Sequence, residues 1–248
     1  SKDPSDVSVE SEDVTYILGA ANKYFPDLHL TVKDVISCYS GVRPLVDDGA
    51  KTEGKTSREH HIFKHSPHIT LVAGGKYTTY RAMAEEIVDT VLANFTFEER
   101  MKWGLSKTVA PLNPAATPEK MQRASLQAPQ VAKELNLPLE LVKSVMDRRG
   151  DESQVIFNYM QLMAKGDPEE RRWRAEAKFS IEHEMCLNLV DFYWRRSPLF
   201  LFHQDNGIKY LRALALTFAS TLGWSDGETQ EQMEKVVSQA AKEKHALI

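Results

Sequence analysis

The hydrophobic and polar positions divide the chain into a mixed first part and a helical second part. In the first part, a short apolar run of strand length at residues 69–72 is interrupted by two glycines at 74–75. An apolar stripe with helical spacing follows, formed by Met83, Ala84, Ile87, Val88, Val91, Leu92 and Phe95. We therefore predict a strand, a glycine turn and a helix, with Thr78 and Thr79 available to cap the helix start.

Other segments of the first part have similar patterns. A helix with one apolar stripe is predicted from Ser11 to Phe25, where it would cover a sheet. Strands rich in β-branched and aromatic residues are expected at residues 35–46, 60–63 and 68–73. Together these strands would form one small sheet.

The second part is predicted to be helical throughout. An irregular connector precedes it, marked by Pro111, Pro114 and Pro118. Helical periodicity then covers residues 131–135, 139–146, 152–163, 168–179, 181–188, 190–196, 208–222 and 227–244. The predicted fold is α+β, with a small partial sheet and covering helices in residues 1–109 and an all-α domain in residues 110–248.

Charge limits what the chain can bind. With 31 basic and 35 acidic side chains its net charge is −4, which implies no bulk attraction to nucleic acid or anionic lipid. The glycine turn is a candidate for a local anion site, because amides at a helix start lack an intrahelical acceptor and Lys76 adds a positive charge. A phosphate, a carboxylate or a reduced flavin would suit it. The alternative is an ordinary strand-to-helix connection with a solvated lysine.

Several features indicate a fragment of a longer intracellular protein. Cys38 and Cys186 lie in separate apolar segments, which favours reduced thiols over a disulfide. No apolar run approaches the length of about 20 residues that a membrane span needs. The chain does not begin with methionine, and none of its twelve glycines belongs to the dinucleotide fingerprint G-x-G-x-x-G. We therefore expect that fingerprint in a missing N-terminal region.

Separated stretches of sequence resemble one known family. They are SEDVTYILGAANKYFPDLHLTVKDVISCYSGVRPLV at 11–46, SREHHIF at 57–63, AGGKYTTYRAMAEE at 73–86 and IEHEMCLNLVDFYWRRS at 181–197. A further stretch, LGWSDGETQEQMEKVV at 222–237, also fits. In these stretches, which occur in the family's order, the chain resembles the C-terminal portion of the FAD-dependent, aerobic glycerol-3-phosphate dehydrogenases and their α-glycerophosphate oxidase relatives.

The resemblance implies roles for residues around the glycine turn. Arg43 and Arg58 are expected to bind the substrate, since arginine grips phosphate oxygens through a planar fork. Lys76 is expected to lie against the isoalloxazine, so that Arg43 and Lys76 form the catalytic pair. The implied cofactor-binding residues are Gly74, Gly75, Lys76, Tyr77 and Thr78, with backbone amides facing the pyrimidine edge of FAD.

The reaction and the partners also follow from the resemblance. sn-Glycerol 3-phosphate would be oxidised to dihydroxyacetone phosphate by hydride transfer to FAD, with quinone as the electron acceptor. The alternative is an oxidase that uses oxygen. The catalytic base is expected in the missing N-terminal FAD-binding region of the same chain. The complete protein would be cytoplasmic and peripheral on the inner face of the cell membrane, with a homodimer as one option.

Two non-enzymatic interpretations stay open. The helical part could be a docking or dimerisation module without catalytic activity. Residues 131–145, VAKELNLPLELVKSV, have the apolar pattern of a DNA-reading helix-turn-helix. That segment is not notably basic and the whole chain is acidic, so we predict no nucleic-acid partner.

Three further clusters have structural alternatives. His60, His61, His65 and His68 lack a nearby cysteine or carboxylate that would complete a tetrahedral set, so no metal is predicted. The sequence IEHEM at 181–185 lacks the second histidine of a zinc-protease motif, because Leu187 occupies that position. Arginines beside Trp173 and Trp194 suggest either contact with an anionic membrane or faces with internal ion pairs.

Overall fold

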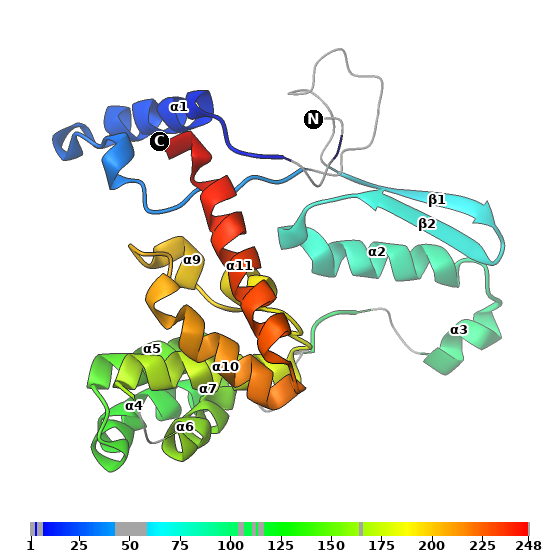
Figure 1. The fold of residues 1–248 in the computed structure, drawn as a ribbon. Helices are drawn as coiled ribbons and strands as arrows, with labels where there is room; N and C mark the ends of the chain where they lie inside the picture. The colour runs from blue at the N-terminus through cyan, green and yellow to red at the C-terminus, as the bar shows by residue number, and fades with distance from the viewer. Residues whose placement is uncertain are drawn as a thin grey trace. The chain divides into compact units, whose positions relative to one another are not determined.

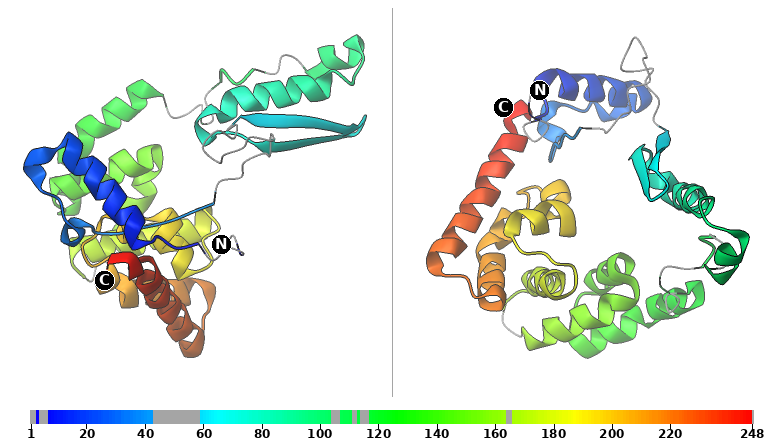
Figure 2. Two further views of the ribbon diagram at one scale, coloured as in Figure 1. Left: turned by 90° about the horizontal axis from the view of Figure 1, so that it is seen from above. Right: turned by 90° about the vertical axis from the view of Figure 1, so that its right-hand side faces the viewer.

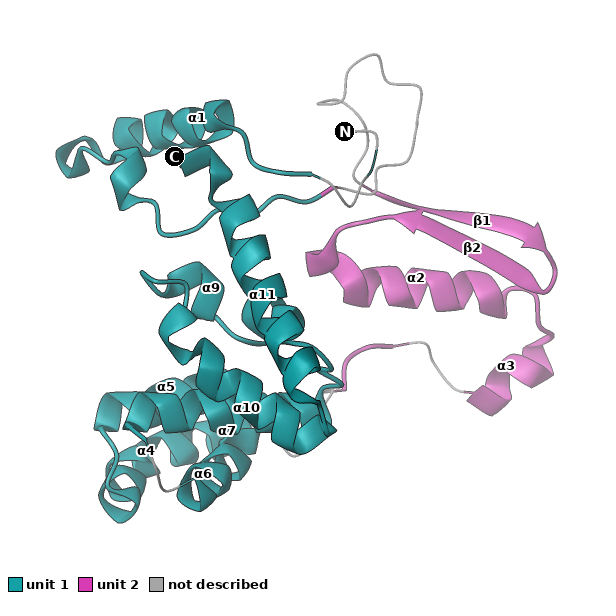
Figure 3. Ribbon diagram, viewed as in Figure 1, with its two compact units in different colours: residues 1–41, 116–248 teal, residues 42–115 magenta. Residues whose placement is uncertain are grey.

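The computed structural model describes residues 3, 7–42, 59–103, 107–110, 113, 117–163 and 166–247 of the chain. They belong to two compact units, residues 1–41 with 116–248 and residues 42–115, which Figure 3 shows in different colours. The first unit is helical, and the second contains a small sheet with helices. The predicted α+β class is therefore confirmed. The functional division at residues 109 and 110 stays a prediction.

The second unit is built on an antiparallel hairpin of β1 (His60–Ser66) and β2 (Ile69–Gly74). Helix α2 (Tyr80–Leu92) lies along the hairpin in each view of Figures 1 and 2, and α3 (Phe97–Trp103) follows it. The register pairs His60 with Gly74, so the start of β1 lies directly beside the glycine turn. Both strands were predicted from the sequence.

One face of the hairpin is apolar and exposed. Phe63 and Leu71 are paired across the two strands, and their side chains are 47% and 51% exposed. His60 contacts α2 through Glu86. Because strand residues alternate between faces, Phe63 and Leu71 lie on the face opposite α2. No other element in the described part of this unit covers that face. An isolated two-stranded hairpin is marginally stable in water.

The strand predicted over residues 35–46 is wrong for its described part. Residues 35–42 form no strand, and residues 43–46 lie outside the described ranges. Polar groups of this segment bond within the helical unit instead of forming a ladder. Ser37 Oγ donates to the carbonyl oxygen of Leu201 at 3.0 Å, and Asn206 Nδ2 donates to that of Ile36 at 3.4 Å. These contacts join residues 35–42 to the helices near residue 200.

The helical unit begins with α1 (Ser11–Tyr24), which was predicted. The other helices are α4 (Pro118–Leu135), α5 (Leu139–Arg149), α6 (Ser153–Leu162), α7 (Pro168–His183), α8 (Leu189–Asp191), α9 (Leu199–Phe202), α10 (Leu211–Leu222) and α11 (Asp226–Glu243). Within α1, Val14 is buried but Ile17 and Tyr24 of the same apolar stripe are exposed. The covering role predicted for this helix is thus only partly fulfilled by the described residues.

Some predicted helix boundaries are wrong. The helix expected over 131–135 begins at Pro118, because Thr117 caps it and Pro118 occupies the first helical position, where proline is favoured. The separate helix expected over 181–188 is absent. Helix α7 continues to His183, and the chain then breaks at Met185, whose φ of 53° is left-handed. The helix expected over 190–196 is a short α8 followed by a π-helix, Phe192–Arg196.

Helix α7 connects two hydrophobic cores. Trp173, Ala177 and Ile181 belong to a core shared with α8, α10 and α11. Ala175 and Phe179, on another side of the same helix, belong to a core shared with α4, α5 and α6. A helix that is buried on opposite sides has little surface left for solvated charge. The polar residues of α7 must therefore find partners inside the protein.

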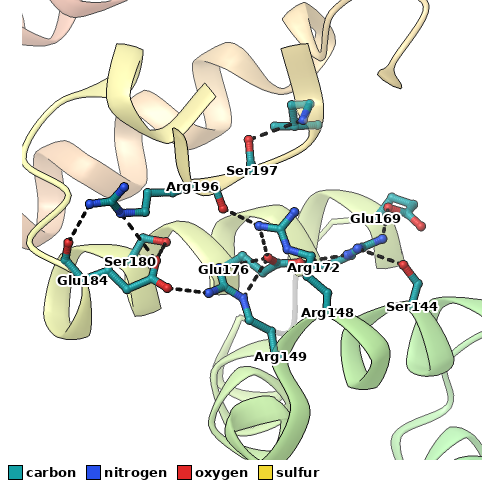
Figure 4. A network of polar contacts seen from close by, with 11 residues as sticks. Ser144, Arg148, Arg149, Glu169, Arg172, Glu176, Ser180, Glu184, Arg196 and Ser197 are labelled. Atoms are coloured by element: carbon teal, nitrogen blue, oxygen red, sulfur yellow. Dashed lines mark hydrogen bonds and ion pairs between the residues drawn. The ribbon is translucent and has the colours of Figure 1, made fainter. Parts of the chain in front are cut away.

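The main internal polar cluster is centred on Glu176, which is fully buried (Figure 4). Its Oε2 lies 3.0 Å from Arg148 Nη2 and 3.1 Å from Arg149 Nη2, and its Oε1 accepts a hydrogen bond from Arg172 Nε at 3.0 Å. Arg149 also pairs with Glu184 at 2.7 Å. A buried carboxylate is tolerated when charge and hydrogen-bond partners surround it. The cluster thus joins α5 to α7.

The arginines beside Trp173 and Trp194 are engaged within the protein. Arg172 stacks over the buried Trp173 ring at 4.2 Å, and Arg171 donates to the carbonyl oxygen of Met160 at 2.9 Å. Arg195 pairs with Asp191 at 2.6 Å. Arg196, the last residue of the π-helix, donates to the carbonyl oxygen of Glu184 at 3.3 Å. These contacts favour the structural alternative for both runs over a membrane contact.

The glycine turn after β2 has a left-handed backbone at both glycines. Gly74 has φ 76° and Gly75 has φ 106°, conformations that residues with a side chain rarely adopt. A Cβ on Gly75 would lie 2.4 Å from Cε of Met83 on α2 and 3.3 Å from Cβ of His60. The backbone therefore favours glycine here, and an added Cβ would also displace the end of the flexible Met83 side chain.

We expect Glu176→Ala to lower the free energy of unfolding of the helical unit by about 3–5 kcal/mol, because it leaves buried arginines uncompensated. Urea unfolding followed by circular dichroism measures this loss. The control is Glu140→Ala on α5, whose carboxylate is 82% exposed and pairs with Lys143. The control should change the stability by no more than about 0.5 kcal/mol. Equal losses in the two variants would contradict the role assigned to Glu176.

We expect Gly75→Ala to destabilise the hairpin and α2 by about 1–3 kcal/mol, because alanine is strained at this φ and meets Met83. Hydrogen exchange of the amides in β2 and α2 measures the local stability. The matched control is Gly19→Ala within α1, where no heavy atom lies within 4 Å of the added Cβ. That substitution should stabilise its helix by up to about 1 kcal/mol. Unchanged exchange in Gly75→Ala would show that the turn tolerates a side chain.

Candidate functional site

The structure brings together one part of the predicted site. Gly74, Gly75, Lys76, Tyr77 and Thr78 follow each other from the end of β2 into a 3₁₀ turn, Tyr77–Thr79, which leads directly into α2. Both predicted substrate residues, Arg43 and Arg58, lie outside the described residues. Their roles stay predictions.

The turn at Lys76 is held by one carbonyl oxygen. The backbone amide and the hydroxyl of Thr79 both donate to the carbonyl oxygen of Lys76, each at 3.1 Å. Thr79 precedes α2 but its side chain does not cap the helix, so the predicted cap at this residue is wrong. The reason is that the Thr79 hydroxyl donates its hydrogen bond to the carbonyl oxygen of Lys76 instead. Amides at the start of such a helix have no acceptor within the helix.

The Lys76 turn is accessible and borders a cavity of about 350 Å³. Tyr77 is 92% exposed, and Lys76 and Thr78 are also exposed. The cavity is lined by Glu59, His60, Lys76, Thr79, Ala82, Met83 and Glu86. Its volume is within the range of small-molecule sites. The predicted lysine therefore lies at a concave surface between the hairpin and α2.

Two further residues of this cavity form a pair that the sequence did not reveal. His60 Nε2 lies 3.0 Å from Glu86 Oε2, and the two side chains are 16% and 63% exposed. The sequence indicates His60 only as part of a histidine cluster, and it assigns Glu86 no role. Only two sequence signals could have indicated this pair. The first is the residue types. The second is the strand register, which places His60 opposite Gly74, while Glu86 lies about two helical turns beyond the glycine turn.

Glu85, which precedes Glu86 in the sequence, attaches α2 to another segment. Glu85 accepts hydrogen bonds from the amide of Thr108 at 2.7 Å and from its hydroxyl at 2.8 Å. These bonds, the amide bond first, hold the pKa of Glu85 below its usual value. Lys107 Nζ adds a contact at 3.4 Å. Consequently α2 has polar attachments both to the start of β1 and to the segment that follows α3.

The turn fits one edge of a flavin. Exposed amides at a helix start and the ammonium of Lys76 would favour the electron-rich pyrimidine edge of a reduced isoalloxazine. The absence of a side chain at Gly75 is not itself evidence for a ligand, because Met83 already occupies the space that a Cβ would need. The features that favour a flavin at this turn are therefore the accessible Lys76 and the turn itself, not the glycine.

No group of three or more His, Cys, Asp and Glu side chains in the described ranges is placed to hold a metal ion. None of the described helices is both long and apolar enough to span a membrane. The segment with a helix-turn-helix pattern forms the end of α4 and most of α5, but Arg148 and Arg149 of α5 bind the buried Glu176. Those two cations are not available to contact phosphates of DNA.

Two family models match the chain. Residues 119–229 match the C-terminal domain of alpha-glycerophosphate oxidase, and residues 1–81 match a model described as FAD dependent oxidoreductase. Among curated relatives, the aerobic glycerol-3-phosphate dehydrogenase of Staphylococcus aureus strain USA300 is 28% identical over 242 residues, which are 94% of this chain and 42% of the relative. That of Staphylococcus haemolyticus strain JCSC1435 is 27% identical over 229 residues, 91% of this chain and 41% of the relative.

A solved structure has the same fold. The glycerol-3-phosphate dehydrogenase of Bacillus halodurans, determined in complex with FAD, matches with a TM-score of 0.71 and 24% identity. The match covers 100% of this chain and 48% of that protein, so the chain spans less than half the length of the relatives it matches. Taken together, the family models and the curated relatives confirm the resemblance to the FAD-dependent glycerol-3-phosphate dehydrogenases and alpha-glycerophosphate oxidases, and the solved structure shows the shared fold.

Proposed function

We propose that the chain is the C-terminal part of an FAD-dependent glycerol-3-phosphate dehydrogenase. The complete enzyme oxidises sn-glycerol 3-phosphate to dihydroxyacetone phosphate and passes the electrons to quinone. The observation that carries this proposal is the accessible Lys76 turn, which lies at the start of α2 and borders a cavity in a chain of this family. The curated relatives are named as aerobic glycerol-3-phosphate dehydrogenases, which supports the choice of substrate.

The residues of this chain bind and orient the reactants. When bound, FAD supplies the hydride acceptor. Lys76 and the amides of Gly75 to Thr78 would hold the pyrimidine edge of the ring and stabilise negative charge there. Arg43 and Arg58 would bind the phosphate and the alcohol end of the substrate. The substrate loses a hydride from its second carbon and a proton from the hydroxyl on that carbon. The base that accepts the proton is expected in the N-terminal region.

The exposed apolar surfaces of the second unit support the view that more of the chain is needed. Phe63 and Leu71 are half-exposed on the open face of the hairpin, where a further layer would bury them. The relatives are more than twice as long as the matched part. The break between the family-model matches, after residue 81 and before residue 119, also brackets the proposed division between residues 1–109 and 110–248.

Acceptor, location and assembly are further parts of the proposal. We propose quinone on the basis of the family resemblance, with oxygen as the alternative acceptor of an oxidase. The same resemblance supports a cytoplasmic enzyme on the inner face of the cell membrane. Stopped-flow reoxidation of the reduced enzyme by a soluble quinone and by oxygen distinguishes the acceptors. A non-catalytic docking or dimerisation module would form a defined oligomer but show no reduction by glycerol 3-phosphate.

We expect Lys76→Ala in the complete enzyme to slow flavin reduction by glycerol 3-phosphate about 100-fold, because it removes a cation that stabilises the developing charge. Rapid mixing under anaerobic conditions, followed at the flavin absorption band, measures the rate. Lys64→Ala on β1 removes a lysine from the same hairpin and should leave the rate unchanged. Arg43→Ala should raise the KM for glycerol 3-phosphate. Equal rates in wild type and Lys76→Ala would contradict the proposed site.

We expect the 248-residue chain alone to bind FAD weakly and to be colourless after purification. The reason is that it contains no dinucleotide fingerprint for the ADP half of the cofactor. Visible absorption spectra and equilibrium dialysis with FAD measure binding. Adding the N-terminal region should give a yellow protein. A flavin-loaded preparation of the isolated chain would contradict the proposed division of the cofactor site.

A further inference from the structure

His60 is unusual among the residues of the cavity beside Lys76. Its Nε2 is buried and makes no hydrogen bond to any described residue, although it lies 3.0 Å from Glu86 Oε2. The contact is therefore one of proximity, not a well-aligned hydrogen bond. Buried polar atoms without a hydrogen-bond partner are uncommon in folded proteins and call for a structural or functional explanation.

His60 is located where it can transmit the position of α2 to the glycine turn. Its backbone pairs with Gly74, and its Cβ lies 3.3 Å from the place that a Cβ on Gly75 would occupy. Its ring reaches Glu86 on α2. The His60 side chain therefore lies beside the glycine turn and reaches α2, the helix that follows this turn.

Glu86 is also placed to influence Lys76. Both side chains line the same cavity of about 350 Å³, and Lys76 has no ion-pair partner among the described residues. A carboxylate at this cavity attracts an ammonium group, and the attraction is stronger at a partly enclosed surface than in bulk water. An imidazole next to Glu86 occupies that carboxylate and leaves the Lys76 ammonium free to interact with a ligand on the open side of the turn.

We infer that His60 and Glu86 are positioning residues that act as a pair, by fixing the Lys76 turn against α2 and by keeping Lys76 from pairing with Glu86. The inference rests on the proposed function, because it gives the pair an effect on a flavin bound at Lys76. It adds two residues that are not expected to touch the flavin or the substrate.

The test uses the complete enzyme with His60→Gln, Glu86→Gln and the double substitution. Each single variant should slow flavin reduction about two- to five-fold, the range expected for a partly exposed ion pair. Each should also shift the visible flavin spectrum and the flavin midpoint potential in the same direction as Lys76→Ala, with the KM for glycerol 3-phosphate unchanged. The double variant should be no slower than the slower single variant, because both substitutions remove the same contact.

Two controls make the outcomes separable. Glu98→Gln on α3 removes an exposed carboxylate from the same unit and should change neither the spectrum nor the rate. Glu86→Gln preserves the size of a side chain that is 63% exposed, so it tests the pair without opening the core. The inference would be overturned if the effects of the two substitutions on the rate were additive in the double variant. It would also be overturned if both single variants had the wild-type flavin spectrum and midpoint potential while Lys76→Ala did not. A wild-type spectrum and rate in Lys76→Ala would instead overturn the proposed function, and the inference with it.

Discussion

The helical unit depends on the balance of charge around one buried carboxylate. Glu176 lies on a helix that is buried on opposite sides by two hydrophobic cores, so water does not solvate its carboxylate. Arg148 and Arg149 approach it from α5, and Arg172 approaches it from one turn earlier on α7. The arginines are ordered in turn by Glu184, Ser144 and the Trp173 ring. Removal of Glu176 takes away the carboxylate that Arg148, Arg149 and Arg172 share, which makes the arrangement of α5 against α7 specific.

The hairpin unit is held by different forces. Its described residues form no comparable core, and its helix α2 is attached by the packing of Met83 under the glycine turn and by polar contacts of Glu85 and Glu86. The accessible Lys76 turn is thus a fixed feature on a lightly stabilised unit. Such a unit gains stability from whatever covers its open apolar face, so cofactor binding and burial of that face would reinforce each other in the complete enzyme.

The two units therefore suit different tasks. The helical unit contains two hydrophobic cores, and its basic clusters are occupied by internal carboxylates and carbonyl oxygens. The hairpin unit presents accessible amides and a cation beside a concave surface. The family that the chain resembles is the basis of the proposed substrate.

The sequence by itself determined local elements and family. The glycine pair, the strand before it and the stripe after it predicted the turn, because backbone conformation and helical periodicity are encoded by neighbouring residues. The four separated motifs indicated the family. The tertiary structure decided the rest. Residues 35–42 have strand-like composition, but a strand exists only where another strand supplies its hydrogen bonds, and here Leu201 and Asn206 supply them instead. Likewise, the arginines beside Trp173 have the pattern of a membrane contact, and the pairing of His60 with Glu86 had no local signal. Arg172 donates to Ser144 and His60 lies against Glu86, and both contacts join residues far apart in the sequence, which only the folded chain brings together.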